Sequence, residues 1–306
     1  MNPARPLRRV AVVAAFALLC APRALAQTAD SAGTETTEIN GWRMAGMSAV
    51  GAGTLGVTYW YAQRNWWDDG YTRFHFDNGA DLVYSRNLDK FGHFYGGAIA
   101  SDLFANALRW SGLGRSTAAW YGFGLSLFVQ MVIEVKDGFS PRWGYSIWDV
   151  TAGTLGSLFT TLKVHNKIFE ALDIKFSYYR RSDKYFSWIK SDGKGTWNDD
   201  YINQTYWFSA KMHSLLPERA ARWWPSWLAL AAGIGVDDSL NGYDARHPDR
   251  TNGNIELYIA LDVDVTRILP SENAFWETLK HYLNYIKFPA PALRLTPRAL
   301  VFGVFF

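Results

Sequence analysis

Polar side chains, most of them ionisable, lie at three places where apolar segments of the chain begin or end. The first group is Asp89, Lys90 and His93; the second is Gln130, Glu134 and Asp137; the third is Ser146 and Asp149. In a helix, residues three or four positions apart share a face, so each group forms one polar stripe. Charged groups in such apolar surroundings are costly unless they pair or act, so we expect the three stripes to converge.

If His93 and Glu134 converge, a carboxylate can orient and charge an imidazole, which is a common acid–base device. We therefore predict His93 as an acid–base residue, with Glu134 and Asp149 as orienting or substrate-binding carboxylates. The remaining members of the three groups are predicted binding residues: Asp89, Lys90, Asp137 and Ser146.

Each of these residues also has a purely structural interpretation. Asp89 has the position of a helix N-cap, and Ser146 with Asp149 has the spacing of a capping box. Lys90 could extend toward a membrane interface, and His93 could be a hydrogen-bonded core histidine. Both interpretations stay open at the level of sequence.

Four uncharged or nearly uncharged runs carry these groups, and each is long enough for a helix. They cover residues 44–61, 94–110, 116–133 and 148–162, with Gly, Asp, Asn or Pro breakers between them. Small residues recur at close-packing spacing, as in Gly92 with Gly96, Ala152 with Gly156, and Gly153 with Ser157. The pattern predicts a bundle of about four helices.

After residue 173 the apolar period changes from 3.6 to 2, which is typical of strands. Alternation covers residues 174–178, 206–212, 228–236, 257–265 and 300–306, and residues 274–286 read as one amphipathic helix. We predict an α+β protein with a membrane-associated helical bundle followed by a small antiparallel β domain. The predicted segments are 1–26 signal peptide, 27–41 disordered leader, 42–165 helical domain and 166–306 β-rich domain.

The first 26 residues have the parts of a secretory signal: a basic head, an apolar run, and Ala24-Leu25-Ala26 before the expected cleavage site. The lone cysteine, Cys20, would leave with this segment. So would four arginines, which leaves 27 basic against 28 acidic side chains. This balance gives no basic footprint for nucleic acid.

Neither a metal nor another cofactor is expected from motifs. The six histidines show no H-x-x-x-H or H-E-x-x-H spacing. The run Gly51-Ala52-Gly53-Thr54-Leu55-Gly56 fits a dinucleotide fingerprint in letters, but it follows a polar leader and no strand. We ascribe its glycines to helix packing.

Fifteen tryptophans, many at the borders of apolar runs, favour contact with a membrane interface. We therefore expect an exported cell-envelope protein with membrane lipid as a partner, at the outer membrane or a periplasmic membrane surface rather than in the inner membrane.

The order Asp89-Lys90-x-x-His93, Glu134-x-x-Asp137 and Ser146-x-x-Asp149-x-x-x-Gly153-x-x-Gly156 resembles the YfiM-like family of periplasmic lipoproteins, whose function is unknown. It is more distantly similar to VanZ-like membrane proteins. The chain departs from the family in lacking a lipoprotein cysteine, because Leu19 precedes Cys20, and in its long β-rich half. The resemblance implies an envelope setting and supplies no catalytic residues. Two functions stay open: a structural or lipid-interacting envelope protein, or a hydrolase or transferase acting on an envelope lipid or glycan.

Overall fold

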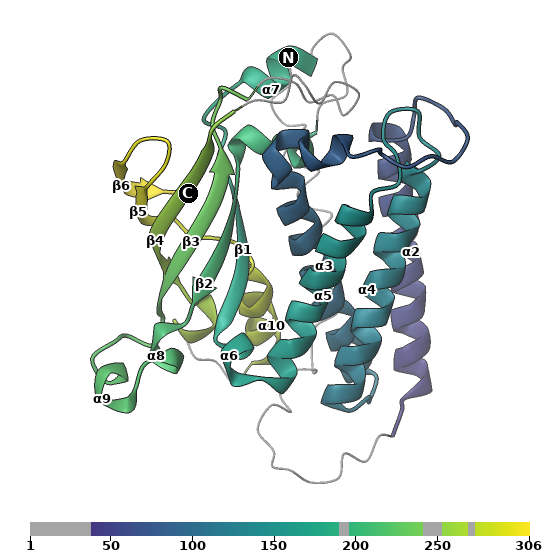
Figure 1. Cartoon of the computed structure of the whole chain (residues 1–306). Helices are drawn as coiled ribbons and strands as arrows, with labels where there is room; N and C mark the ends of the chain where they lie inside the picture. The colour runs from purple at the N-terminus through teal and green to yellow at the C-terminus, as the bar shows by residue number, and fades with distance from the viewer. Residues whose placement is uncertain (1–37, 190–195, 241–252, 269–272) are drawn as a thin grey trace, which may run out of the picture.

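A computed structural model describes residues 38–189, 196–240, 253–268 and 273–306. The predicted signal peptide, Cys20 and residues 27–37 of the predicted leader lie outside the described residues. Long helices form one side of the molecule and an antiparallel sheet forms the other (Figure 1). The predicted α+β class, with helices first and strands after, is confirmed.

Four long helices make up the helical side, as the apolar runs predicted. They are α2 (Gly41–Asn65), α3 (Leu88–Trp110), α4 (Arg115–Asp137) and α5 (Ile147–His165). Helices α3, α4 and α5 pack together, whereas α2 contacts α3 only lightly. Among the described helices, α4 has the length and apolar composition needed to cross a membrane.

Glycines allow the backbones of α3 and α5 to pack closely against each other. A Cβ on Gly156 would lie 1.8 Å from the Phe94 carbonyl oxygen, and a Cβ on Gly97 would lie 2.1 Å from that of Gly153. Gly156 of the predicted pair with Ala152, and Gly153 of the predicted pair with Ser157, thus have the packing role that their spacing predicted. Gly51, Gly53 and Gly56 of α2 are different, because no atom lies within 4 Å of a Cβ placed there. Our assignment of these three glycines to helix packing was wrong.

The sheet is a meander in which each strand pairs antiparallel with the next. Its strands are β1 (Leu172–Tyr178), β2 (Gln204–Ala210), β3 (Leu228–Val236), β4 (Ile255–Val263), β5 (Ala290–Arg294) and β6 (Leu300–Phe305). The short helix α6 (Lys167–Glu170) precedes β1, and further short helices lie between the strands: α7 (Lys184–Ile189), α8 (Met212–Leu215), α9 (Glu218–Ala221) and α10 (Ala274–Leu283). Single 3-10 turns complete the described chain: η1 (Ala80–Leu82), η2 (Tyr84–Asn87), η3 (Trp197–Asp199), η4 (Tyr201–Asn203) and η6 (Val265–Arg267).

Element ends differ from the sequence prediction in a few places. Strand β2 stops before Met212, which begins α8, and α10 ends at Leu283 rather than at residue 286. Strand β5 was missed because Pro291, which has no N–H to donate, lies inside it.

The sheet packs its first two strands against the bundle through aromatic rings. Tyr95 of α3 lies 5.6 Å from Phe176 of β1 and 6.1 Å from Tyr206 of β2, measured between ring centroids. Phe94 meets Phe208 in the same way at 5.5 Å. These contacts fix α3, and the side chains it carries, relative to the sheet.

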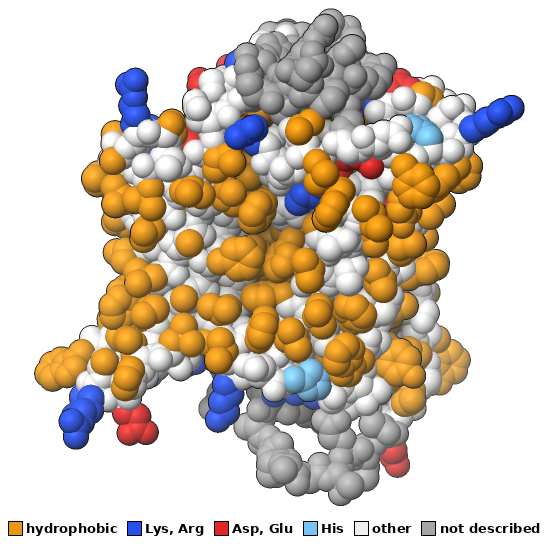
Figure 2. All heavy atoms as spheres, in the orientation of Figure 1, with side chains coloured by type: hydrophobic (Ala, Val, Ile, Leu, Met, Phe, Trp, Pro, Cys, Tyr) orange, Lys and Arg blue, Asp and Glu red, His pale blue; other side chains and the backbone are white. Residues whose placement is uncertain are grey.

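Strand β4 has its polarity reversed relative to a strand of a soluble sheet. It exposes Leu257, Ile259 and Leu261 and buries Glu256 and Asp262. The buried charges are paired, as where the Lys175 ammonium lies 2.8 Å from the Asp262 carboxylate. We use the term apolar surface for seven of the exposed apolar side chains of α4, α5 and β4: Leu125, Phe128, Val132, Leu155, Leu257, Ile259 and Leu261. Figure 2 shows hydrophobic side chains across the middle of one face, with Lys, Arg, Asp and Glu mainly at its two ends.

Candidate functional site

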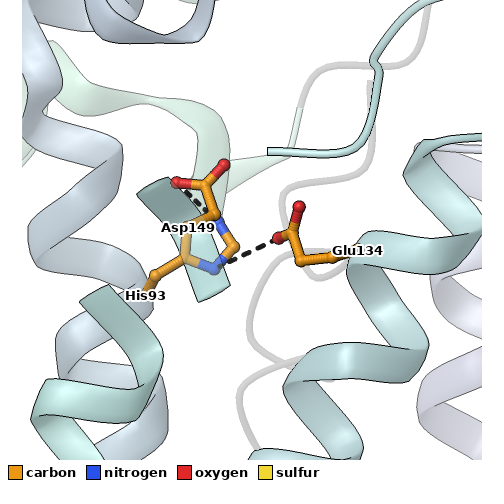
Figure 3. Close-up of side chains that lie close together, drawn as sticks. All are labelled: His93, Glu134 and Asp149. Atoms are coloured by element: carbon orange, nitrogen blue, oxygen red, sulfur yellow. Dashed lines mark ion pairs between the residues drawn. The ribbon is translucent and has the colours of Figure 1, made fainter. Parts of the chain in front are cut away.

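Three helix ends meet on one side of the bundle and bring His93, Glu134 and Asp149 together (Figure 3). Glu134 Oε1 lies 3.7 Å from His93 Nδ1, and Asp149 Oδ1 lies 3.7 Å from His93 Nε2. The imidazole is therefore flanked by one carboxylate at each nitrogen. Its side chain is 26% exposed, whereas the Glu134 side chain is 2% exposed. The convergence expected from the sequence is present.

The helix directions explain this convergence. His93 is in the second turn of α3 and Asp149 in the first turn of α5, while Glu134 is in the last turn of the antiparallel α4. The close approach of α3 and α5 at Gly97 and Gly153 draws the first turns of these two helices together.

Lys90 occupies the centre of a second group of acids beside the histidine. Its ammonium lies 2.8 Å from both Asp89 Oδ2 and Asp149 Oδ1, and it also pairs with Asp81. Asp81 in turn accepts a hydrogen bond from the Ser146 hydroxyl. We call Asp81, Asp89, Lys90, His93, Glu134, Asp137, Ser146 and Asp149 the polar cluster.

Glu134 is one of the acids of the polar cluster with a buried oxygen that has no hydrogen-bond partner among the described residues. Its Oε2 accepts a hydrogen bond from the Ser146 backbone N–H at 3.3 Å. Its Oε1 is buried and has no hydrogen-bond partner among the described residues. An unpaired buried carboxylate oxygen is expensive and requires an explanation.

The pKa values of these acids are shifted in different directions, because burial raises them and nearby cations lower them. Burial, aided by the charges of Asp149 and Asp137, raises the pKa of Glu134 to about 10. Burial also raises the pKa of Asp149, although the nearby His93 and Lys90 oppose it. Burial works against the charge of Asp81 too, but Lys90 outweighs it and holds the Asp81 pKa below its usual value. Acids with opposite shifts in one cluster are a common mark of functional sites.

Asp137 stands apart from the imidazole. Its Oδ1 accepts a hydrogen bond from the Trp67 indole N–H at 2.6 Å, and burial raises its pKa to about 7. Its partner Trp67 lies just after α2, and no spacing rule could indicate this contact. Asp81 was likewise missed, because it lies in a turn-rich segment that reads only as a separator between helices.

The structure supports the structural interpretation of Ser146 and contradicts those of Asp89 and Lys90. Ser146 does cap α5, since its hydroxyl accepts the Asp149 backbone N–H at 3.2 Å. Asp89 is no N-cap, because Asn87 has that position and α3 begins at Leu88. Lys90 is held among three acids rather than extended toward a membrane interface.

A cavity of about 2260 Å³ opens beside the polar cluster. His93, Glu134, Asp149, Asp89 and Asp81 line one part of it. The rest has mostly apolar walls, formed by Val50 and Leu55 of α2, Ile99 and Leu103 of α3, Ile133 of α4 and Leu283 of α10. The light contact between α2 and the bundle leaves this space open.

The segment that carries the polar cluster matches one known family. Residues 77–165 fit the family model described as "Predicted periplasmic lipoprotein (DUF2279)". This range runs from the turn before η1 to the end of α5, so it contains every residue of the polar cluster. The match supports an exported, periplasmic envelope location for this chain, and the function of the matched family is unknown. No curated protein and no solved structure matches the chain.

Proposed function

We propose that this envelope protein binds a membrane lipid, with the acyl chains in the cavity and the polar head at the polar cluster. The observation that carries the proposal is the make-up of the cavity: apolar over most of its wall and strongly polar where His93, Glu134 and Asp149 line it. Its volume of about 2260 Å³ exceeds the roughly 300–1,000 Å³ of ordinary small-molecule pockets. A long amphiphile matches both its size and its polarity.

The apolar surface supports a membrane setting for this ligand. Exposed side chains such as Phe128 and Ile259 would be covered by lipid chains, while charges such as Asp262 stay paired inside the sheet. A protein placed in this way would receive its ligand from the surrounding membrane.

A matched pair of glycine variants tests lipid binding. Gly96 is an exposed glycine of α3 that lines the cavity, and a Cβ there would lie 3.8 Å from its nearest neighbour, Gln130 Nε2. Gly96→Leu therefore adds a side chain to the cavity without a backbone clash. We expect the purified protein to retain several-fold less co-purifying lipid, measured by mass spectrometry of the extracted protein.

Gly124→Leu is the control. Gly124 is an exposed glycine of α4 with no atom within 4 Å of a Cβ, and it does not line the cavity. It should retain lipid at the wild-type level. Equal lipid content in wild type and both variants, or no lipid in the wild type, would contradict the proposal.

A second candidate function, hydrolysis of the bound lipid, is favoured by the place of His93 at the cavity wall. His93 would take a proton from water, whose oxygen attacks an ester carbonyl carbon; the ester C–O bond breaks, and the alcohol leaves with the proton from the imidazolium. Glu134 and Asp149, one at each ring nitrogen, would orient the ring.

This candidate is tested by incubating the purified protein with an extract of envelope lipids and following lipid species by mass spectrometry. Wild type should consume an ester lipid over time, and His93→Gln should not. His281→Gln is the control. His281 Nε2 lies 2.6 Å from Asp102 Oδ2, and neither of these two residues lines the cavity. If no species changes with wild type, lipid binding without chemistry is the function that stands.

A further inference from the structure

Asp149 belongs to two groups of neighbouring side chains, and only one of these groups contains a lysine. Asp81, Asp89 and Asp149 surround the Lys90 ammonium. The second set is His93, Glu134 and Asp149, whose donor atoms all lie within 4.8 Å of one another. Within the described part of the chain, no lysine or arginine forms an ion pair with Glu134. The whole polar cluster contains five acidic residues but only one lysine and one histidine, so its acidic groups outnumber its basic groups.

Glu134 supplies an independent sign that a ligand is bound here. It is 1% exposed, and its Oε1 lacks a hydrogen-bond partner among the described residues. Figure 3 shows its carboxylate directed at the imidazole of His93. At 3.7 Å the Glu134–His93 contact is too long for a hydrogen bond, so the two groups face each other across a gap.

We propose that His93, Glu134 and Asp149 bind a divalent metal ion, with zinc or manganese as the fitting class. Donor atoms held by one tetrahedral zinc at about 2.0–2.2 Å lie roughly 3.3–3.6 Å from one another. The 3.7 Å separation of Glu134 Oε1 and His93 Nδ1 is close to that value. Asp149 Oδ1 lies 3.7 Å from the other ring nitrogen, Nε2, so its carboxylate would shift toward Nδ1 to reach the same ion. We expected no metal because the sequence has no metal-binding motif. Such motifs detect ligands that are close in sequence, whereas these three ligands lie on three different helices.

The donor set decides the class of ion. One imidazole with two carboxylates suits zinc or manganese, whereas calcium and magnesium prefer oxygen donors alone. Three protein donors leave a position for water or a lipid headgroup, as catalytic metal sites do. The 26% exposure of the His93 side chain toward the cavity fits such an open position. A metal on His93 would replace its role as a base, so the two are alternative routes to hydrolysis.

The test uses the full exported chain in detergent, stripped of metal with EDTA and freed of lipid. Calorimetric titration with zinc chloride and with manganese chloride should show one bound ion per chain for at least one of the two. Glu134→Gln and His93→Ala should each weaken binding by about tenfold or more. Because lipid is absent, this result is independent of the lipid-binding proposal.

The control is a second histidine–carboxylate pair of the same chain. His281→Ala removes the partner of Asp102 and should leave metal affinity unchanged. Circular dichroism identifies any variant that fails to fold. A second measurement uses the wild type alone. Pulsed electron paramagnetic resonance of the protein loaded with manganese or copper should show coupling between the ion and an imidazole nitrogen. Absence of both ions from the titration, or binding without nitrogen coupling, would overturn the proposal.

Discussion

At the scale of single residues, the polar cluster places charge where burial opposes it. Glu134 is the clearest case, because burial raises its pKa from 4.5 to about 10. Between these two values the folded protein holds a proton that the unfolded chain has released. The stability contributed by this group therefore falls as pH rises through that range. A site that keeps such a residue holds it at the expense of stability, which is common for functional acids.

Replacing this acid should stabilise the metal-free protein. In EDTA at pH 8, Glu134→Gln removes the cost of a buried carboxyl that tends to ionise while keeping an acceptor for the Ser146 N–H. We expect a melting temperature a few degrees higher than that of the wild type, since about 1 kcal/mol corresponds to roughly 2–4 °C in a chain of this size class. The difference should shrink at pH 5. A lower melting temperature at pH 8 would contradict this reading of Glu134.

Asp173 should behave in the opposite way. Burial works against its charge, but Lys163 and Lys211 outweigh burial and hold its pKa below the usual range. Its stabilising contribution is present at neutral pH and is lost as pH falls toward the folded-state pKa. Asp173→Asn should therefore lower the melting temperature at pH 8 and converge with wild type in acid. Thermal melts of both variants over the same pH series check the two signs together.

At the scale of elements, the position of the polar cluster depends on how closely α3 and α5 approach. The backbones touch where Gly97 faces Gly153 and where Gly156 faces Phe94. Even one methyl group at these positions would force the helices apart. Because His93 and Asp149 are on these two helices, a change in their separation would move both side chains.

Gly156→Ala should therefore destabilise the fold, since its Cβ would lie 1.8 Å from the Phe94 carbonyl oxygen. Gly124→Ala is the matched change in α4, where no atom lies within 4 Å, and it should stabilise by about 0.5–1 kcal/mol through helix propensity. Thermal melts of both variants measure the contrast. If Gly156→Ala were as stable as Gly124→Ala, the tight crossing of α3 and α5 would be refuted.

The elements were largely predictable because each has a local periodicity. The four apolar runs became α2 to α5, and alternation located β1, β3 and β4 closely. The stripes of Asp89 with His93 and of Glu134 with Gln130 also followed from helical spacing. What spacing cannot give is the contact between elements. The partnership of Asp81 with Ser146 and of Trp67 with Asp137 joins residues more than sixty positions apart, and it depends on how the helices pack.

At the scale of the whole molecule, strand β4 buries charged side chains and exposes apolar ones. Glu256 pairs with Arg181 and Arg294 inside, at 2.6 Å each, while Leu257 and Ile259 face outward. In water this arrangement would be unfavourable, because apolar side chains are exposed and the buried ions lose their hydration. In contact with lipid the exposed side chains are in their preferred surroundings, and the paired ions avoid the acyl chains.

A charge on this outward face should therefore disturb membrane association while leaving the fold intact. Ile259→Arg places a guanidinium on the apolar surface, where a lipid-facing charge costs up to about 2–4 kcal/mol. We expect a clearly smaller fraction of protein to float with phospholipid vesicles in a density gradient. Ile168→Arg is the control, because Ile168 is 63% exposed on the short helix α6 between Lys167 and Glu170, away from the apolar surface. Equal flotation of both variants and wild type would show that β4 does not contact lipid.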